Sequence, residues 1–508
     1  MLDDVSTAAD STGGRISRRG RTQGPRVFGT WRLALFSFIF IASINSTPAL
    51  ASYGLSSIFF YGIAIVFLLV PTALTSSELG ASIPATGGIY VWTRTALGDR
   101  LGFLVIWLEW AAQVIAMPVI MTTIATQVAY GFDPALADDN MFMFLVVVIT
   151  IWGMTLISTR GLKVARQLNL VAVFVGNLIP ALIIVGLAIL WLAQGRGSQM
   201  PLTPSAVVPQ WDGFATIVFA STTFLMFAGI EISAIHAGDV TNPSRTIPRA
   251  NGIAALLCIA LFVPVTLAIG VVVPASTESV VAGVMQAVRD FFPAFGMSWA
   301  VPVFALMIAS GLALSVMQML GGPARGVMVA AREGNLPKFF QHENGKGAPI
   351  RIILVQSVVS SILATLFVLM PSVQNAWWAL AATQTQLTLL IYVIMYAALR
   401  RLRKTQPDLE RPYRIPGGRI GMYVVTVGGS LACLSVIAIN FVPPSQLDSV
   451  SFPLYAGAMI LGVVVVCGLP FLARAFRKPG WVTVSEAVTD AAAEADVAAS
   501  EDPEPAPA

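Results

Sequence analysis

A glycine two residues before a carboxylate, Gly229 and Glu231, lies inside an otherwise apolar run at 214–233. About 20 residues at 1.5 Å per residue cross the ~30 Å hydrocarbon core of a bilayer, so this run is long enough to span a membrane. A carboxylate at that depth costs roughly 2.5–3.5 kcal/mol or more, which predicts a role for it. Glycine weakens a helix and lets a substrate or another backbone approach. Residues 228–231 therefore predict an interrupted transport helix.

A matching interruption is predicted near the N-terminus, at Asn45, Ser46, Thr47 and Pro48. The proline removes a helical hydrogen bond and clashes with the preceding turn. Each predicted break lies about 12–15 residues from the point where its helix enters the membrane. Paired broken helices in two halves of a chain point to a substrate site near the bilayer midplane. The alternative is an ordinary proline kink in one helix and a packing glycine in the other.

These breaks belong to a series of apolar segments. With 56% hydrophobic and 11% charged residues, the chain differs from soluble proteins, in which about 25% charged residues is usual. We predict an all-α integral membrane protein with twelve spans, near 31–50, 56–77, 101–130, 141–159, 168–193, 214–236, 251–273, 298–319, 351–370, 375–399, 420–442 and 452–475.

Basic residues predict the orientation of these spans. Of the 30 Lys and Arg, only Arg196 and Arg289 fall in loops on the predicted outer side. By the positive-inside rule, both termini are expected in the cytoplasm. The net charge of +4 therefore reflects topology, and we infer no nucleic-acid partner from it.

Other chemistries lack their motifs. Cys258, Cys433 and Cys467 fall within predicted spans and match neither a disulfide framework nor a zinc site. The sequence has no phosphate-binding loop of the Gly-x-x-x-x-Gly-Lys type. Within the predicted core the sequence has one Asp-Asp pair, Asp138-Asp139, which falls short of the repeated motifs that a magnesium-dependent prenyltransferase would need. We therefore predict no cofactor, no metal and no enzymatic activity.

The two ends differ from the core in composition. Residues 1–30 are polar and Arg-rich, and are expected to be a disordered leader; together with the apolar run from Leu33, they also resemble a cleavable signal peptide. Residues 481–508 are expected to be a disordered tail, in which 482–508 carry seven acidic residues and no Lys or Arg. The transporter core is predicted at 31–480, with one five-helix unit at 31–193, a second at 214–400, and two further helices at 420–475.

Several motifs, in this order along the chain, resemble the amino acid–polyamine–organocation superfamily. They are Glu78-Leu79-Gly80, the segment 84–92, Arg160-Gly161, Gly229-Ile230-Glu231 with Asn242-Pro243, and the segments 322–326, 335–340 and 407–418. The resemblance covers about residues 30–480, and the 229–243 and 407–418 blocks are most similar to the glutamate:γ-aminobutyrate antiporter group. It implies a leucine-transporter-type fold, a five-plus-five inverted repeat with two additional helices, and alternating access.

The resemblance also implies how a substrate is held. Main-chain N–H groups at the first break would bind an α-carboxylate, and carbonyls at the second break would bind an α-ammonium, as helix-end electrostatics favour. The residues implied at the second break are Phe227, Ala228, Gly229 and Ile230, and those implied at the side-chain end of the pocket are Gln318, Met319, Thr388 and Tyr392. The small neutral residues at 45–47, Met319 and Thr388 depart from the antiporter pattern, which leaves the cargo open.

Three glutamates carry alternative interpretations. Glu231 could couple transport to protons, or it could brace the broken helix by accepting backbone hydrogen bonds. Glu109 could likewise be a coupling group or a structural hydrogen-bond acceptor. Glu78, at the predicted cytoplasmic end of the second span, is expected to pair with a loop arginine.

The sequence therefore predicts secondary active transport of amino acids across the cytoplasmic membrane, as an exchanger or a proton-coupled symporter. One alternative is a polyamine or amine carrier, which would need additional carboxylates in the pocket; Glu231 and Glu109 are the candidates. A non-transporting nutrient sensor that signals through its tail is another. Because Arg greatly outnumbers Lys and alanine is frequent, as in high-GC bacteria, we expect a bacterial inner membrane.

Overall fold

The computed structural model describes residues 29–84, 88–159, 174–209, 222–232, 240, 242–275, 279–345, 347–443 and 451–483. The described residues are mostly helical and form no β-strand; an isolated bridge joins Glu333 and Val482.

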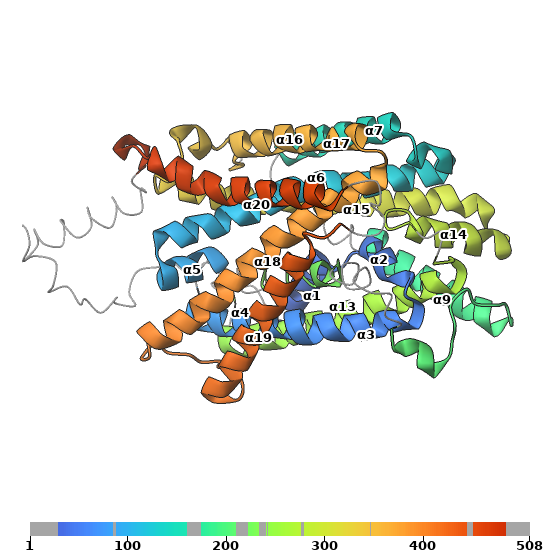
Figure 1. Ribbon diagram of the computed structural model, residues 1–508, viewed down its shortest axis with the longest axis horizontal. Coiled ribbons are helices and arrows are strands. Elements are labelled where there is room, and N and C mark those ends of the chain that lie inside the picture. Colours follow the sequence, from blue (N-terminus) through green and yellow to red (C-terminus); the bar gives the residue numbers. More distant parts are fainter. Residues whose placement is uncertain are drawn as a thin grey trace, which may run out of the picture.

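Ten helices in the described part are long and apolar enough to cross a membrane, and most run along the long axis of the molecule (Figure 1). The first joins α3 (Ser57–Ala64) and α4 (Val70–Ser82) through a π-helical turn at Ile65–Leu69. The others are α6 (Asp99–Phe132), α7 (Asn140–Ser158), α9 (Ile179–Ala193), α13 (Pro243–Val272), α15 (Val301–Arg332), α16 with α17 (Ile350–Ala364 and Leu366–Leu369), α18 (Val373–Thr405), α19 (Gly418–Ile439) and α20 (Phe452–Ala475).

The two further spans of the predicted twelve are the two expected to be broken. The first of them begins with α1 (Thr30–Ile41), which is apolar but too short to cross alone. Of the other, the structure describes α11 (Thr222–Met226) and the turn that follows it, whereas 210–221 and 233–239 lie outside the described residues. The count of twelve and the inverted repeat therefore stay predictions.

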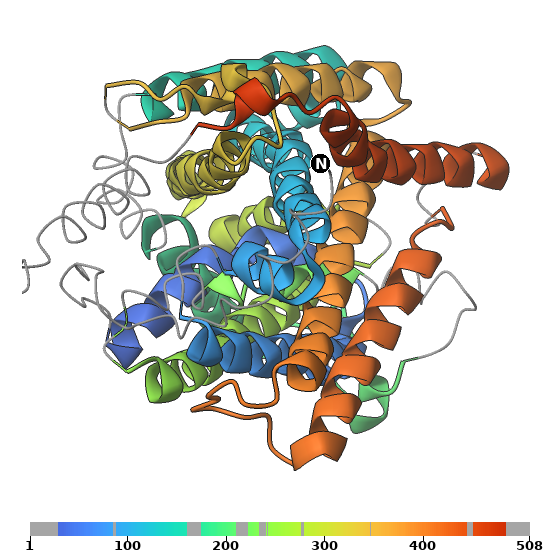
Figure 2. The same ribbon diagram turned by 90° about the vertical axis from the view of Figure 1, so that its left-hand side faces the viewer.

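Burial orders the helices from the centre to the edge. In its most apolar stretch α6 is 72% buried, and it packs against α15 and α18. The corresponding stretch of α20 is only 17% buried, which places this helix at the rim, where Figure 2 shows it projecting from the bundle. In Figure 1, α7, α16 and α17 lie along one side and α3, α13 and α19 along the other. The core therefore lies around α6, α15 and α18.

Polar side chains join helices inside the apolar bundle. Thr155 on α7 hydrogen-bonds Ser357 on α16 at 2.6 Å, and Ser360 donates to the carbonyl of Val114 on α6 at 2.7 Å. Lipid gives helices little hydrophobic reason to associate, so such bonds and close packing help to fix their positions.

Two short helices lie at opposite ends of the bundle in Figure 1: α5 (Ile89–Leu97) and α14 (Gly283–Ala294). The end with α5 also holds the basic C-terminal turn of α18, with Arg403 and Lys404. It is the end that we predict, from the distribution of basic residues in the sequence, to face the cytoplasm.

Candidate functional site

The first interrupted helix ends at Ile41, and Ala42 and Ser43 are extended. A 3₁₀ turn at Ile44–Ser46 and the short helix α2 (Pro48–Ala51) follow. The break thus begins at Ala42, three residues before the predicted segment 45–48, and it includes the predicted residues Asn45, Ser46 and Thr47. The proline is the first residue of α2, where a helix needs no N–H donor, so it starts a helix and does not kink one.

Of the backbone N–H groups at this break, one has a side-chain partner and two have none among the described residues. The N–H of Ile44 donates to Asn177 Oδ1 at 3.0 Å. The N–H groups of Ser43 and Asn45 donate to none of the residues that the structure describes. Both residues line the cavity described below, so these two amides are candidate donors for a ligand.

The second interruption falls at the predicted residues. After α11 the chain turns through 227–231, with Gly229 at φ +108°, a backbone conformation that strongly favours glycine. A Cβ atom at Gly229 would lie 2.8 Å from Cδ1 of Phe40 and 3.4 Å from Cγ1 of Ile41. The turn after α11 therefore packs directly against the last turn of α1, and the two breaks are neighbours.

Tyr392 on α18 holds the second break. Its hydroxyl accepts the N–H of Gly229 at 2.8 Å and donates to Glu231 Oε2 at 2.9 Å. This geometry fits the bracing interpretation of Glu231, and the coupling interpretation stays a prediction.

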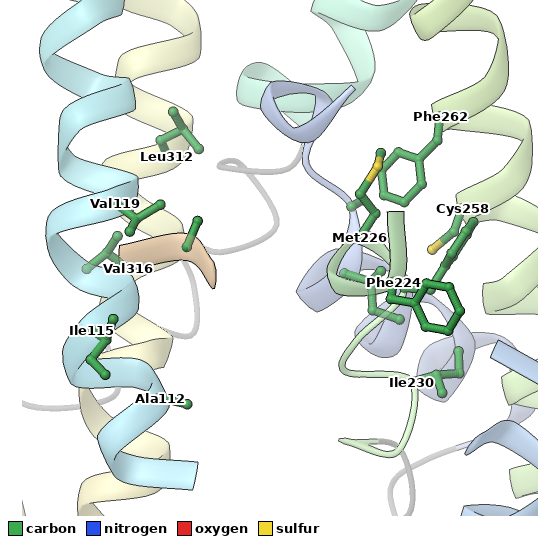
Figure 3. Close-up of a cluster of buried hydrophobic side chains, with 14 of the residues drawn as sticks. Ala112, Ile115, Val119, Phe224, Met226, Ile230, Cys258, Phe262, Leu312 and Val316 are labelled. Atoms are coloured by element: carbon green, nitrogen blue, oxygen red, sulfur yellow. The ribbon is translucent and has the colours of Figure 1, made fainter. Parts of the chain in front are cut away.

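A cavity of about 280 Å³ lies between the two breaks and the helices around them. Its walls include α6 and α15 on one side and the turn after α11 on the other. Figure 3 shows Ala112 and Val119 of α6 beside Leu312 and Val316 of α15, with Met226 on the opposite side; all five line the cavity. The volume is near the lower end of the range for small-molecule sites, about 300–1,000 Å³.

Nine of the fourteen predicted site residues line this cavity: Asn45, Ser46, Glu109, Ala228, Gly229, Glu231, Met319, Thr388 and Tyr392. They come from five separated segments of the chain. Gln318 lies in α15, but its side chain is outside the described residues.

Four predicted residues are buried behind the cavity wall: Thr47, Pro48, Phe227 and Ile230. Thr47 donates its hydroxyl to the carbonyl of Ile44 at 2.6 Å. Phe227 packs edge-on against Tyr61, with ring centres 6.0 Å apart, and Figure 3 shows Ile230 among apolar side chains. The side chains of these four residues pack inside the protein around the two breaks. Their main-chain groups could still contact a ligand, because a main-chain contact does not require the side chain of the same residue to face the cavity.

Sequence reasoning missed several polar residues of the site. Asn177 lines the cavity and fastens the first break from the π-helical turn Phe174–Leu178 before α9. Gln113 also lines it, one helical turn beyond Glu109. Both could have been found in the sequence. Asn177 is a lone amide in an apolar span, and Gln113 lies four residues after Glu109, a spacing that places both on one face of a helix. Gln127 is buried and donates to Asn45 Oδ1 at 3.0 Å, which holds Asn45 against α6.

The cavity is acidic. Glu109 and Glu231 both line it and interact electrostatically, and no Lys, Arg or His is found among its described lining residues. The Glu231 carboxylate accepts a hydrogen bond from Tyr392, whereas Glu109 has no hydrogen-bond partner within the described part of the chain. The site therefore offers backbone amides for an anion and carboxylates for a cation.

Ion pairs close the α5 end of the structure. Ile89 lines the cavity, and the next residue, Tyr90, donates its hydroxyl to Glu333 at the end of α15. Arg94 pairs with Glu333 at 2.6 Å and with Asp99 at 2.8 Å. The hydrogen bond that Arg94 donates to the Asp99 carboxylate raises the pKa of Arg94. Together these contacts connect α5 to α15 beside the cavity.

Glu78 forms buried ion pairs at the same α5 end of the structure. It is fully buried at the end of α4, and Arg403 of α18 donates to both of its carboxylate oxygens, at 2.7 and 2.5 Å. The N–H of Ile415 donates to it at 2.8 Å, and Arg411 lies 3.8 Å away. The predicted pairing with an arginine is confirmed, but the main partner is on a helix; the loop arginine, Arg411, is the secondary one.

Comparisons with known proteins show the family of this chain. A family model described as amino acid permease matches residues 28–466. The chain is 33% identical to an uncharacterised transporter of Legionella pneumophila over 88% of its length and 96% of the relative's. It is 27% identical to a glutamate/γ-aminobutyrate antiporter of Lactococcus lactis (90% and 93%) and 24% identical to a probable agmatine/putrescine antiporter of the same species (85% and 92%). The ten long apolar helices in its described part make it a multi-pass membrane protein. The chain belongs to the amino acid permease family of the amino acid–polyamine–organocation superfamily.

Proposed function

We propose that the chain is a secondary active transporter that exchanges amino acids across the bacterial plasma membrane by alternating access, with both termini in the cytoplasm. The observation that supports this proposal is the cavity between the two helix breaks, which is lined by Ser43 and Asn45 of the first break and by Ala228 and Gly229 of the second. The α-carboxylate of the amino acid would accept hydrogen bonds from the N–H groups of Ser43 and Asn45, which have no partner among the described residues. The α-ammonium would bind near the turn after Met226, where the helix end leaves carbonyls without the N–H groups of a further turn.

The charge of the lining selects among amino acids. A cargo with a second carboxylate, such as glutamate, would bring an uncompensated negative charge next to Glu109 and Glu231, because no basic side chain is found among the described lining residues. A neutral or cationic side chain avoids this cost. We therefore propose an amino acid with a non-acidic side chain as the cargo, although two relatives are named for glutamate.

A second candidate function is favoured by the same two carboxylates. A cation with two amino groups could place one near Glu231 and the other near Glu109, whose carboxylate has no hydrogen-bond partner among the described residues. A relative named as a probable agmatine/putrescine antiporter supports an amine carrier as the alternative.

Ligand-dependent thermal stability tests the proposal. Detergent-purified protein would be heated with the common amino acids, γ-aminobutyrate and diamines, each at mildly acidic and neutral pH. A ligand at 100 times its Kd stabilises the folded state by about 2.7 kcal/mol, which a thermal shift detects readily. Neutral or cationic amino acids should shift the melting temperature. Diamines acting alone would favour the second candidate, and a shift confined to glutamate and aspartate would contradict both.

A further inference from the structure

A groove of about 770 Å³ lies on the outer surface of the bundle, away from the transport cavity. Three elements form it: the start of α1, the π-helical turn at Ile65–Leu69, and the first half of α13. Its lining residues are Thr30, Trp31, Ile65, Leu69, Val70, Arg249, Gly252, Ile253, Ala255, Leu256 and Ile259.

The groove is open to the bilayer. Trp31, Val70 and Leu256 are 66%, 43% and 68% exposed, so these apolar side chains project away from the protein core. On α13 the groove passes Gly252, where an added Cβ atom would meet nothing within 4 Å. An apolar chain supplied by the membrane can therefore lie along α13 at this position.

The groove crosses the boundary between the hydrocarbon and the headgroups. On α13 the apolar run begins at Gly252 and continues to Val272, about 30 Å of helix. Arg249 precedes that run by about one helical turn, which places its guanidinium at the level of lipid phosphates. Trp31, at the start of α1, is of the residue type that gathers at this interface.

The headgroup end carries positive charge. Arg245 and Arg249 are both exposed and lie four residues apart, on the same face of α13. Like charges at this spacing repel, so an anion between them would relieve the repulsion. Neither arginine has an ion-pair partner within the described part of the chain, and the described lining of the groove has no Asp or Glu.

We propose that this groove is a binding site for an anionic phospholipid. One acyl chain would lie along Gly252, Leu256 and Ile259, and the phosphate would pair with Arg249 near the Thr30 hydroxyl. By the positive-inside rule this is the cytoplasmic leaflet. A bound lipid would connect α1, which carries the first helix break, to α13. The proposal does not depend on the cargo.

Lipid titration of delipidated protein in detergent tests it, with phosphatidylglycerol, phosphatidylcholine and acyl-free glycerophosphate as probes and native mass spectrometry as the readout. Phosphatidylglycerol should bind more tightly than phosphatidylcholine, and glycerophosphate should not bind measurably. Arg249→Gln should weaken phosphatidylglycerol binding roughly fivefold, from about 1 kcal/mol per basic residue near a membrane surface. The matched control is Arg401→Gln, an exposed arginine at the end of α18 and outside the groove.

A second variant tests the acyl end without changing charge. Gly252→Leu fills the groove with a side chain that has open space there and suits a helix, so the protein should fold. It should weaken the binding of phosphatidylglycerol. Equal binding of the two phospholipids to the wild type, or unchanged phosphatidylglycerol binding in both Arg249→Gln and Gly252→Leu, would overturn the proposal. Because no substrate is involved, these results are independent of any failure of the transport proposal.

Discussion

The Tyr392 hydroxyl lies 2.9 Å from Glu231 Oε2, to which it donates. Through this bond a side chain of α18 spans the break after α11, because the same hydroxyl accepts the N–H of Gly229. The bent main chain at the break is thus held by a hydrogen-bonded carboxylate inside the membrane, where unsatisfied polar groups are costly. The shape of the cavity depends on this contact.

Tyr392→Phe should therefore damage transport more than folding. The change removes both hydrogen bonds and leaves buried partners unsatisfied, at a cost of roughly 1–3 kcal/mol. We expect a lower melting temperature, normal assembly by size-exclusion chromatography, and loss of most substrate exchange. The matched control is Tyr396→Phe, one turn further along α18, whose hydroxyl bonds Thr72 at 2.8 Å and which does not line the cavity. If both variants transport equally, Tyr392 has no special role.

Gly229→Ala should distort the second break. The alanine would have to adopt φ +108°, with its Cβ 2.8 Å from Phe40, so either the turn or the end of α1 must move. We expect weaker ligand-induced thermal stabilisation. Gly153→Ala on α7 is the control: nothing lies within 4 Å of the added Cβ, and alanine favours the helix by about 1 kcal/mol. Unchanged ligand binding in Gly229→Ala would show that the turn is not part of the site.

The two cavity glutamates should behave differently. Because Tyr392 braces Glu231, we expect Glu231→Gln to lower both stability and exchange at every pH. Glu109 has no hydrogen-bond partner among the described residues and faces the cavity, so it is the better candidate for proton coupling. Glu109→Gln should retain exchange but lose its dependence on an imposed pH gradient, measured in liposomes with and without that gradient. Coupling that survives in Glu109→Gln and disappears in Glu231→Gln would reverse this assignment.

The buried ion pair at the α5 end should matter for stability. Glu78→Gln leaves Arg403 without its main partner, and breaking a buried pair costs roughly 3–5 kcal/mol. A clear fall in melting temperature is expected. Asp99→Asn removes an exposed partner of Arg94, 59% accessible, and should change the melting temperature little. Similar effects of the two changes would contradict a structural role for Glu78.

The sequence was most informative where a residue type is costly in lipid. Glu231, two residues after Gly229, predicts the second break because neither a buried carboxylate nor a glycine is favourable in a spanning helix. The ten long helices follow from the length of apolar runs, and the pairing of Glu78 with an arginine follows from the cost of a lone buried charge.

The first break shows what local patterns leave undetermined. Proline signals an interruption, but it suits the first turn of a helix as well as a kink, so Pro48 did not predict that the break begins at Ala42 or that a new helix begins at the proline itself. The Ile44 amide within the break donates to Asn177, 133 residues away, a contact that the local pattern does not encode. Likewise, the side chains of Thr47, Phe227 and Ile230 face away from the cavity because of tertiary packing, which a one-dimensional motif does not encode.

Exchange in proteoliposomes tests directly whether the protein transports amino acids. Vesicles containing purified protein would be preloaded with one unlabelled amino acid or diamine at a time, and the uptake of the same compound in labelled form would be followed. We expect saturable exchange of an amino acid with a neutral or cationic side chain, strongly reduced in Tyr392→Phe and retained in Tyr396→Phe. Exchange confined to acidic amino acids, or uptake unaffected by Tyr392→Phe, would contradict it.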